Sequence, residues 1–402
     1  MRNFIFISPN FPENYWMFCR ELKNNGINVL GIGDQPYDEL RQELKESLTE
    51  YFKVDTLEDY NAVYRATAFF IFKYGRIDWI ESNNEYWLER DAMLRTDFNI
   101  FSSFRVEDLP RIKYKSKMKP YYIQAGIPVA RYHMVDTLEN ARNFIEKTGY
   151  PVVAKPDNGV GASHTYKISN EEELSAFFAE KPEDTLYIME EFIHGEVNSY
   201  DAIIDSNGEP IFETGNVTPS CLMDVVNNLD NSIYYIVKEL PEDTKAFGRA
   251  TVKSFGVKSR FVHFEFFRLL SDHEGIGKAG DLMALEVNMR PCGGCTPDMI
   301  NFAHSTNVYK IWADMIAFDK STAEVGKHAY CAFAGRRDGK TFKYSHEEIM
   351  ELYKDNMKMD GRIPDALSGG MGNQMYIANF SSKKNMDKFY RDILKEVKRK
   401  AK

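Results

Sequence analysis

The sequence predicts a mixed protein of the α/β and α+β classes that begins with a doubly wound parallel α/β domain. Three observations predict this class. The length of 402 residues exceeds one typical domain. Short apolar runs alternate with amphipathic helical patterns near the start of the chain, and strand-like patterns dominate its middle. Hydrophobic residues form 43% of the chain, which is ample for the cores of two or three packed modules.

Residues 1–112 are expected to form the first module. Its first strand is a compact apolar run that stops at Ser8 and Pro9, as a buried parallel strand does. Strands and helices then alternate, which is typical of a parallel sheet covered by helices. The second helix is expected to begin at Thr56, with Asp59 three residues later. The expected strands are 4–7, 27–32 and 77–81, and the expected helices are 12–24, 56–73 and 85–95.

Residues 113–188 are expected to form a small α+β module. Asp136 with Glu139, and Ser169 with Glu172, have the spacing of helix caps. A glycine-containing loop lies between a short buried strand and the second of these helices. The expected strands are 130–135, 152–155 and 186–189, after a first helix at 117–125.

Residues 189–402 are expected to form the third module. Asn207 and Gly208 favour a hairpin turn between strands 198–205 and 209–214. Two later strands, 261–270 and 282–288, flank a polar turn and should pair antiparallel. The rest of the module is expected to contain a helix at 241–255, a strand at 330–334, a helix capped by Ser345 and Glu348, a glycine-rich loop at 369–372 and a terminal helix.

Composition excludes several classes of function. The net charge of −9, from 51 basic and 60 acidic residues, makes non-specific nucleic-acid binding a poor interpretation. Five cysteines, an odd and sparse set, indicate a reducing compartment. The N-terminal residues resemble a first strand, not a signal peptide, and the longest apolar run is too short to span a bilayer. A soluble cytoplasmic protein without a membrane or nucleic-acid partner is therefore expected.

The segment 284–294 is the most informative motif. Glu286, Asn288 and Arg290 are each two residues apart, so on a strand they point to one face. Carboxylate and amide oxygens suit magnesium, and an arginine can bind phosphoryl oxygens in a fork. Glu265 lies on the strand expected to pair with this one, where its carboxylate would repel that of Glu286 without a cation. A solvent-facing charged strand is the alternative, and the apolar residues around both glutamates disfavour it.

Two further segments can contact a nucleotide. Lys155 ends a buried strand, and the loop after it holds Gly159, Gly161 and Ser163, whose backbone can face phosphate oxygens. This loop has neither the spacing of a Walker A loop nor that of a dinucleotide site. The segment 187–193 has the pattern of an apolar crevice with a carboxylate at Glu190, which can hold adenine. Taken alone, each segment is better explained as an ordinary turn or edge strand.

The order of these features along the chain resembles the ATP-grasp superfamily, from about residue 4 to about residue 316. Within it, the chain is similar to the carboxylate–amine ligases and to the carbamoyl-phosphate-synthase-like branch. The first module resembles the pre-ATP-grasp domain of that superfamily, including the stretch from Ser82 to Glu85.

The resemblance implies a role for each matching residue. Lys115 matches the first phosphate-contacting lysine, although Lys113 and Lys117 compete with it because Tyr114 stands where an aspartate is usual. Val197 stands where the glutamate that contacts the ribose is usual, which leaves Glu196 or Asp201 for that contact. The other implied roles are phosphate contact for Lys155, Gly159, Gly161 and Ser163, adenine contact for Glu190, Glu191, Phe192 and Ile193, magnesium or manganese binding for Glu265, Glu286 and Asn288, and catalysis for Arg290 with Lys155.

The activity that the resemblance implies is an ADP-forming ligase reaction. ATP would convert a small carboxylate, such as that of an amino acid, into an acyl phosphate, and an amine would then displace phosphate to give an amide. Two alternatives stay open: carboxylation or carbamoyl-phosphate-type chemistry on bicarbonate, and a nucleotide-binding protein without catalysis. Sequence patterns predict neither the two substrates, nor the oligomeric state, nor the role of the chain after about residue 326.

Overall fold

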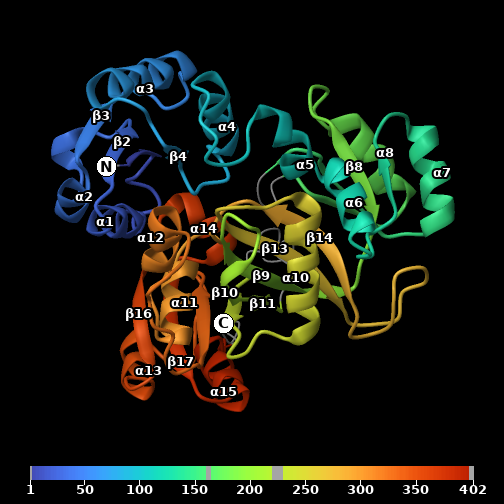
Figure 1. Cartoon of the computed structure of the whole chain (residues 1–402). Coiled ribbons are helices and arrows are strands. Elements are labelled where there is room, and N and C mark those ends of the chain that lie inside the picture. Colours follow the sequence, from blue (N-terminus) through green and yellow to red (C-terminus); the bar gives the residue numbers. More distant parts are fainter. Residues whose placement is uncertain (1, 160–163, 220–229, 398–402) are drawn as a thin grey trace.

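Three β-sheets organise the computed structural model, which describes residues 2–159, 164–219 and 230–397. Figure 1 shows the N-terminal sheet, the small sheet and the large central sheet as separate layers joined by helices. This architecture confirms the predicted combination of a parallel α/β module with α+β modules.

The N-terminal sheet is parallel, in the order β3-β2-β1-β4. Its two faces are covered by different helices, α1 and α2 on one side and α3 and α4 on the other, so the module is doubly wound as predicted. The strand order reverses between β1 and β4, and the loops after these two strands lead toward the large sheet. The bounds are β1 (Asn3–Ile7), α1 (Trp16–Asn24), β2 (Asn28–Gly33), α2 (Gln42–Ser47), β3 (Glu50–Lys53), α3 (Tyr60–Tyr74), β4 (Trp79–Glu81) and α4 (Leu88–Asp97).

Two details of this module differ from the prediction. Helix α3 begins after Asp59, whose carboxylate accepts hydrogen bonds from Asn61 N and Ala62 N, so the start predicted at Thr56 was wrong. The carboxylate of Asp59 reaches the free amide groups of the first turn directly. Strand β3 and helix α2 were not predicted, because the half-buried edge strand has a charged residue at each end and no apolar run.

The small sheet is antiparallel, in the order β5-β8-β6-β7, and two helices cover it. Both helix starts lie one residue later than predicted, because Thr137 and Asn170 are the residues whose side chains cap them. Strand β7 was not predicted. The bounds are β5 (Tyr132–Met134), α7 (Leu138–Thr148), β6 (Val152–Pro156), β7 (Tyr166–Ile168), α8 (Glu171–Glu180) and β8 (Tyr187–Glu191).

The large sheet runs β14-β13-β9-β11-β12-β15-β17-β16, with β10 paired to β9. Both predicted hairpins are confirmed, since β9 pairs antiparallel with β10 and β13 with β14. The glycine-rich loop predicted at 369–372 was wrong: most of it lies in helix α14, which begins directly after Pro364. The strands are β9 (Gly195–Ile204), β10 (Pro210–Thr214), β11 (Asn216–Thr218), β12 (Ser232–Ile236), β13 (Arg260–Leu269), β14 (Leu282–Asn288), β15 (Tyr330–Arg336), β16 (Met357–Arg362) and β17 (Gln374–Phe380).

Helices α10 and α6 pack on one face of the large sheet. On the other face, α11 and α12 pack near Ile203 and Phe261, and polar side chains lie farther along β9 and β13. Tyr200, Phe264, Phe266 and Val287 form the buried layer beneath α10 and α6. Because side chains alternate along a strand, the residues between them point to the opposite side. The helices not yet given are α5 (Leu109–Lys113), α6 (Lys115–Gln124), α10 (Glu242–Phe255), α11 (Thr296–His304), α12 (Val308–Phe318), α13 (His346–Leu352), α14 (Asp365–Met371) and α15 (Lys383–Ile393).

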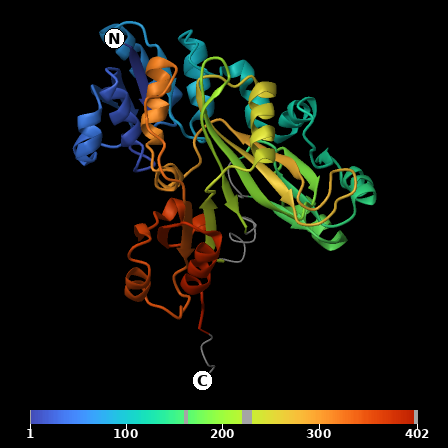
Figure 2. The same cartoon turned by 60° about the horizontal axis from the view of Figure 1, so that its bottom comes forward.

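The modules meet through shared cores. Helix α12 packs against α1 of the N-terminal module, where the rings of Phe18 and Trp312 lie 5.0 Å apart, and Figure 2 shows these helices side by side. Helix α6 precedes the small sheet in sequence but packs on α10, since Met118 and Tyr122 share a core with Val252. The predicted module limits at 112 and 188 stay a prediction.

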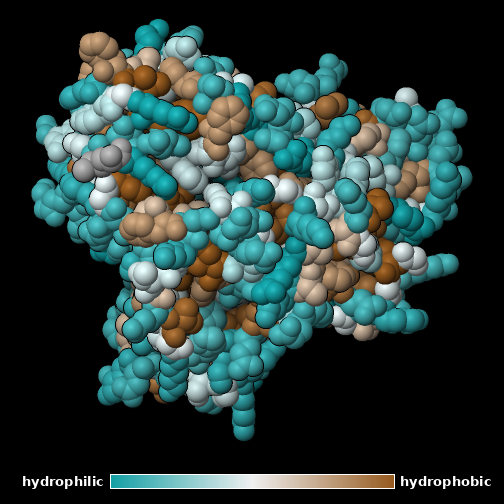
Figure 3. Space-filling view, in the orientation of Figure 1, coloured by the Kyte–Doolittle hydropathy of each residue, from teal (hydrophilic) through white to brown (hydrophobic). Residues whose placement is uncertain are grey.

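The outside of the molecule is largely hydrophilic on the face shown in Figure 3. Among the residues that the structure describes, no helix combines the length and apolar character needed to cross a bilayer.

Candidate active site

Two paired strands bring the predicted metal ligands to one face of the large sheet, and a third strand adds Asp201 to this face. Glu265 of β13 lies directly opposite Glu286 of β14, and His263 lies opposite Asn288. On the other side of β13, His263 pairs with Asp201 of β9. Directly opposed residues in a sheet share a face, so these five side chains lie on the side away from α10.

The two glutamates differ in their electrostatic surroundings. Burial raises the pKa of Glu286; the ammonium group of Lys115 opposes that rise, and the carboxylate of Glu265 adds to it. Burial alone would also raise the pKa of Glu265, but the neighbouring His263 and Arg290 lower it. The pKa values of these two opposed carboxylates are therefore shifted in opposite directions.

This donor set fits a magnesium ion that also binds phosphate. The side chains of Glu265 and Glu286 keep 28% and 23% of their surface exposed, so both can reach a ligand. Within the described part of the chain, no group of three or more His, Cys, Asp or Glu side chains can enclose a metal ion by itself. Magnesium in nucleotide sites usually takes one or two carboxylates and completes its shell with phosphate oxygens and water.

Lysines approach the same face from the small module and from α6. Lys115 Nζ lies 3.8 Å from Glu286 Oε1 and donates to Gly159 O at 3.2 Å. Lys155 Nζ lies 2.7 Å from Glu190 Oε2, and the charges of Glu286 and Glu265 also act on it. Of the two competing lysines, Lys113 pairs with Glu85 of the N-terminal module and Lys117 is exposed.

Glu190 is buried between two ammonium groups. Lys119 Nζ lies 2.5 Å from Glu190 Oε1, on the side opposite Lys155. Burial alone would raise the pKa of Glu190, but the two lysines outweigh it and lower the pKa to about 2. Sequence patterns did not identify Lys119, although its position one turn after Lys115 on α6 is a usable signal.

Replacing this carboxylate should change acid stability in a defined direction. A folded-state pKa near 2, against 4.5 in the unfolded chain, stabilises the fold above pH 4.5, and this stabilisation is lost as the pH falls toward 2. Glu190→Gln should therefore lower the free energy of unfolding at pH 7 by on the order of 3 kcal/mol. Urea unfolding of both proteins from pH 7 to pH 2 should show this difference shrinking. Glu172→Gln, at an exposed helix position, is the control, and an unchanged difference at all pH values would contradict the assignment.

The other residues predicted to contact adenine or phosphate differ in what surrounds them. Glu191 points to the opposite face of β8 from Glu190 and pairs with Arg131 at 2.6 Å. Phe192 lies under Lys167, whose Nζ is 4.3 Å from the ring centroid, and Ile193 is buried in an apolar cluster. Gly161 and Ser163 lie outside the described residues. The roles predicted for all six of these residues, including Glu190, stay predictions.

The two candidates for ribose contact lie on different faces of β9. Glu196 pairs with Arg268 and points to the α10 side, whereas Val197 pairs with Phe267 and shares the face of Glu265. Asp201 is also on this face, but it is fully buried and its Oδ1 lies 2.7 Å from His263 Nδ1. Neither carboxylate is thus both exposed and on the face of the predicted metal ligands.

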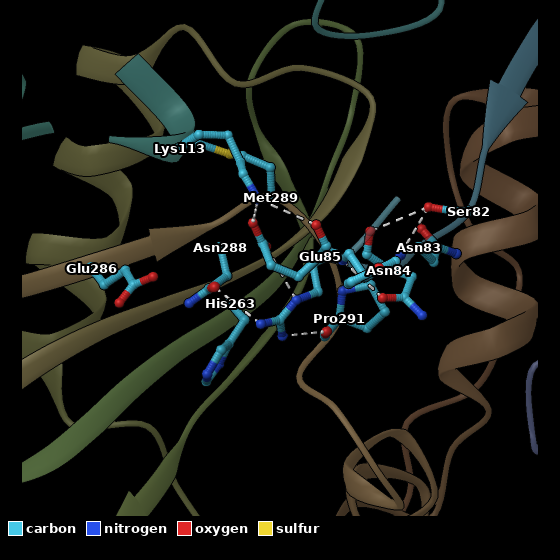
Figure 4. A network of polar contacts seen from close by, with 12 residues as sticks. Ser82, Asn83, Asn84, Glu85, Lys113, His263, Glu286, Asn288, Met289 and Pro291 are labelled. Atoms are coloured by element: carbon cyan, nitrogen blue, oxygen red, sulfur yellow. Dashed lines mark hydrogen bonds and ion pairs between the residues drawn. The ribbon is translucent and has the colours of Figure 1, made fainter. Parts of the chain in front are cut away.

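Arg290 joins this face to the N-terminal module. Its Nη2 donates to Asn288 Oδ1 at 3.0 Å, and its Nε lies 3.3 Å from Glu85 Oε2. Figure 4 shows Asn288, Glu85 and Lys113 in this polar network. Lys113 Nζ lies 3.0 Å from the other oxygen of Glu85. Burial alone would lower the pKa of Arg290, but Glu85 raises it, so the guanidinium is firmly charged.

His263 is a buried site residue whose role sequence patterns did not identify. Its Nε2 lies 3.1 Å from Glu265 Oε1, so it connects Asp201 with the predicted metal ligand. Burial alone would lower the pKa of His263, but Cys292 and Asp201 raise it well above its usual value. The spacing His263–Glu265 on one strand was a signal that both side chains share a face.

A parallel N-terminal sheet, a small antiparallel sheet, and a carboxylate pair on the large sheet that Lys115 of α6 and Lys155 of β6 approach are the arrangement that the sequence predicted for an ATP-grasp protein. Residues 148–298 match the ATP-grasp domain family. The chain therefore contains an ATP-grasp domain, as the sequence predicted, and its similarity to ligases agrees with the predicted ligase class.

Individual proteins resemble the chain over different lengths. The L-arginine-specific L-amino acid ligase of Bacillus subtilis is 25% identical over 316 residues, which are 75% of this chain and 71% of that protein. The carbamoyl phosphate synthase large chain of Clavibacter michiganensis is 31% identical over 94 residues, which are 23% of this chain and 9% of that protein. The crystal structure of L-amino acid ligase from Bacillus licheniformis covers 100% of this chain and 99% of its own, with a TM-score of 0.73 and 16% identity. Both predicted branches are therefore represented among its homologues.

Proposed function

We propose that this chain is an ADP-forming ligase that activates the carboxylate of one amino acid and joins it to the amine of another. The observation that carries the proposal is the opposition of Glu265 and Glu286, beside Asn288, on a face that Lys115 approaches to 3.8 Å. Carboxylates, an amide oxygen and ammonium groups at this spacing suit a triphosphate with its magnesium. Amino acids are proposed as substrates because two of the similar proteins are L-amino acid ligases.

The chain's own residues would act mainly by position and charge. Lys115 and Lys155 would neutralise phosphate oxygens of ATP, and Glu190 would hold Lys155 in place. Arg290 would bind the oxygens of the transferred phosphoryl group while the substrate carboxylate attacks it and ADP leaves. The amine then attacks the acyl carbon, phosphate leaves, and the nitrogen loses a proton. Magnesium, held by Glu265, Glu286 and Asn288, would supply charge neutralisation on the β- and γ-phosphates.

Release of ADP in the presence of defined substrates tests the proposal. The purified chain is incubated with ATP, magnesium and single or paired amino acids, and both ADP and the amide product are measured. ADP formation is expected to rise at least about tenfold when an accepted carboxylate and amine are both present, because the acyl phosphate is then consumed. Chelation of magnesium should abolish it.

The same assay separates the alternatives. Bicarbonate-dependent ADP release without an amide product would replace the proposal with carboxylation or carbamoyl-phosphate-type chemistry. Tight nucleotide binding with no ADP release across all amino acid pairs and simple carboxylates would contradict any ligase activity of the chain.

A further inference from the structure

We propose that Arg260 is a positioning residue that fixes Arg290 by tying the strand before it to the N-terminal module. This inference rests on the proposed function, in which Arg290 contacts the transferred phosphoryl group. It concerns a different residue, which lies on the other side of β13 from Glu265 and touches no proposed substrate or metal ligand.

Arg260 makes contacts with three separate parts of the chain. It is the first residue of β13 and is 3% exposed. Its Nε donates to Met289 O at 2.6 Å, and its Nη2 donates to Glu81 Oε1 at 2.9 Å. Its Nη1 donates to Ser103 Oγ and lies 2.9 Å from the second oxygen of Glu81. One rigid guanidinium therefore joins the large sheet, the N-terminal sheet and the segment between them.

The contact with Met289 matters because β14 ends just before it. The antiparallel ladder of β13 and β14 holds the backbone through Asn288. Beyond Asn288 the ladder supplies no further bond, and Arg290 follows only two residues later. The hydrogen bond from Arg260 to the carbonyl of Met289 thus orients the peptide that leads directly into Arg290.

The N-terminal module fixes the segment around Arg290 through two glutamates. Glu81, the last residue of β4, binds Arg260, and Glu85, four residues later, binds the side chain of Arg290 at 3.3 Å. Glu81 is itself fixed, because Arg95 lies 3.5 Å from it and also donates to Ile80 O at 2.7 Å. The position of β4 against β14 therefore determines where the Arg290 guanidinium lies.

The chemistry of the contact also favours a positioning role. A buried ion pair is a poor source of stability, because removal of both charges from water offsets most of their attraction. A well-packed apolar pair would hold two modules together equally well. It would not offer a donor to Met289 O, and that donor is what Arg260 supplies in addition to its charge.

Two variants separate positioning from mere stability. Arg260→Lys keeps a cation for Glu81 but cannot span both Glu81 and Met289 O. The double variant Arg260→Met with Glu81→Gln removes both charges of this pair, and Arg95, which also loses the Glu81 carboxylate, keeps the buried Asp91 as a neighbouring carboxylate. Arg249→Lys is the control for loss of an arginine fork, because Arg249 also pairs with a glutamate, Glu213, at 2.5 Å, and its side chain is half exposed.

The readout is the split between kcat and KM in the ADP-release assay, together with thermal unfolding. In both Arg260 variants kcat should fall roughly 10- to 100-fold, while the KM for ATP and the Kd of an ATP analogue change less than about threefold, since the lysines that face ATP are untouched. The double variant should unfold near the wild-type temperature and still have the low kcat, and Arg249→Lys should match the wild type in both.

Recovery of wild-type kcat in the double variant would overturn the proposal, because it would show that only stability was lost. If the double variant does not fold, Arg260→Lys decides by the same criterion, and an unchanged kcat overturns the proposal. Absence of ADP release by the wild type would instead contradict the proposed function and is recognised before any variant is made.

Discussion

Glu286→Gln is expected to reduce magnesium-dependent ADP release by at least about 100-fold, because loss of even an outer partner of a metal ligand costs roughly 10- to 100-fold. The amide has nearly the same shape as the carboxylate but carries no charge. It therefore removes the negative charge that the proposed metal site and Lys115, which lies 3.8 Å away, would share, while the strand pairing with Glu265 is kept. Burial and the charge of Glu265 already disfavour the ionised form, so folding should not suffer from the neutral side chain.

The measurement is ADP release as a function of magnesium concentration, with unfolding temperature as the check on folding. Glu242→Gln is the matched control, because its side chain is 89% exposed on the first turn of α10. A folded Glu286→Gln variant that releases ADP at the wild-type rate and magnesium dependence would remove the metal site from β13 and β14.

The two strands that carry the proposed metal ligands were predictable because the pattern that indicates them is local. An alternating pattern on each side of a polar turn predicts an antiparallel hairpin, and the structure has β13 and β14 in that pairing, with Glu265 opposite Glu286. The parallel N-terminal sheet was predictable for a similar reason, since each buried strand is a continuous apolar run.

The contacts between modules were not predictable from local patterns. Lys119 meets Glu190 only because α6, which packs on α10, carries this side chain to the small sheet, and Arg260 meets Glu81 across 179 positions of sequence. Local patterns in a single sequence do not indicate how two modules are oriented against each other. Helix α14 was missed for a different reason. Its local composition favoured a loop, whereas Leu367 and Met371 pack on the core beneath it and stabilise a helix.

Arg290→Ala is expected to lower kcat by roughly 100- to 1,000-fold with little change in nucleotide binding, because a fixed donor aimed at developing charge typically contributes that much. The Arg290 side chain is 15% exposed, and its Nε lies 3.3 Å from Glu85 Oε2. Lys115 and Lys155 are supplied by other elements, so they still contact ATP in the variant. The loss should therefore appear in kcat and in kcat/KM alike.

Arg290→Lys sharpens this test, because it keeps the charge but loses the planar pair of donors. If the fork is what binds the phosphoryl oxygens, Arg290→Lys should recover only a small part of kcat. If charge alone matters, it should recover most of it. The variants are compared by single-turnover ADP formation, with Kd for an ATP analogue measured in parallel. Wild-type turnover in Arg290→Ala would contradict the proposed mechanism, because in that mechanism the guanidinium of Arg290 binds the transferred phosphoryl group.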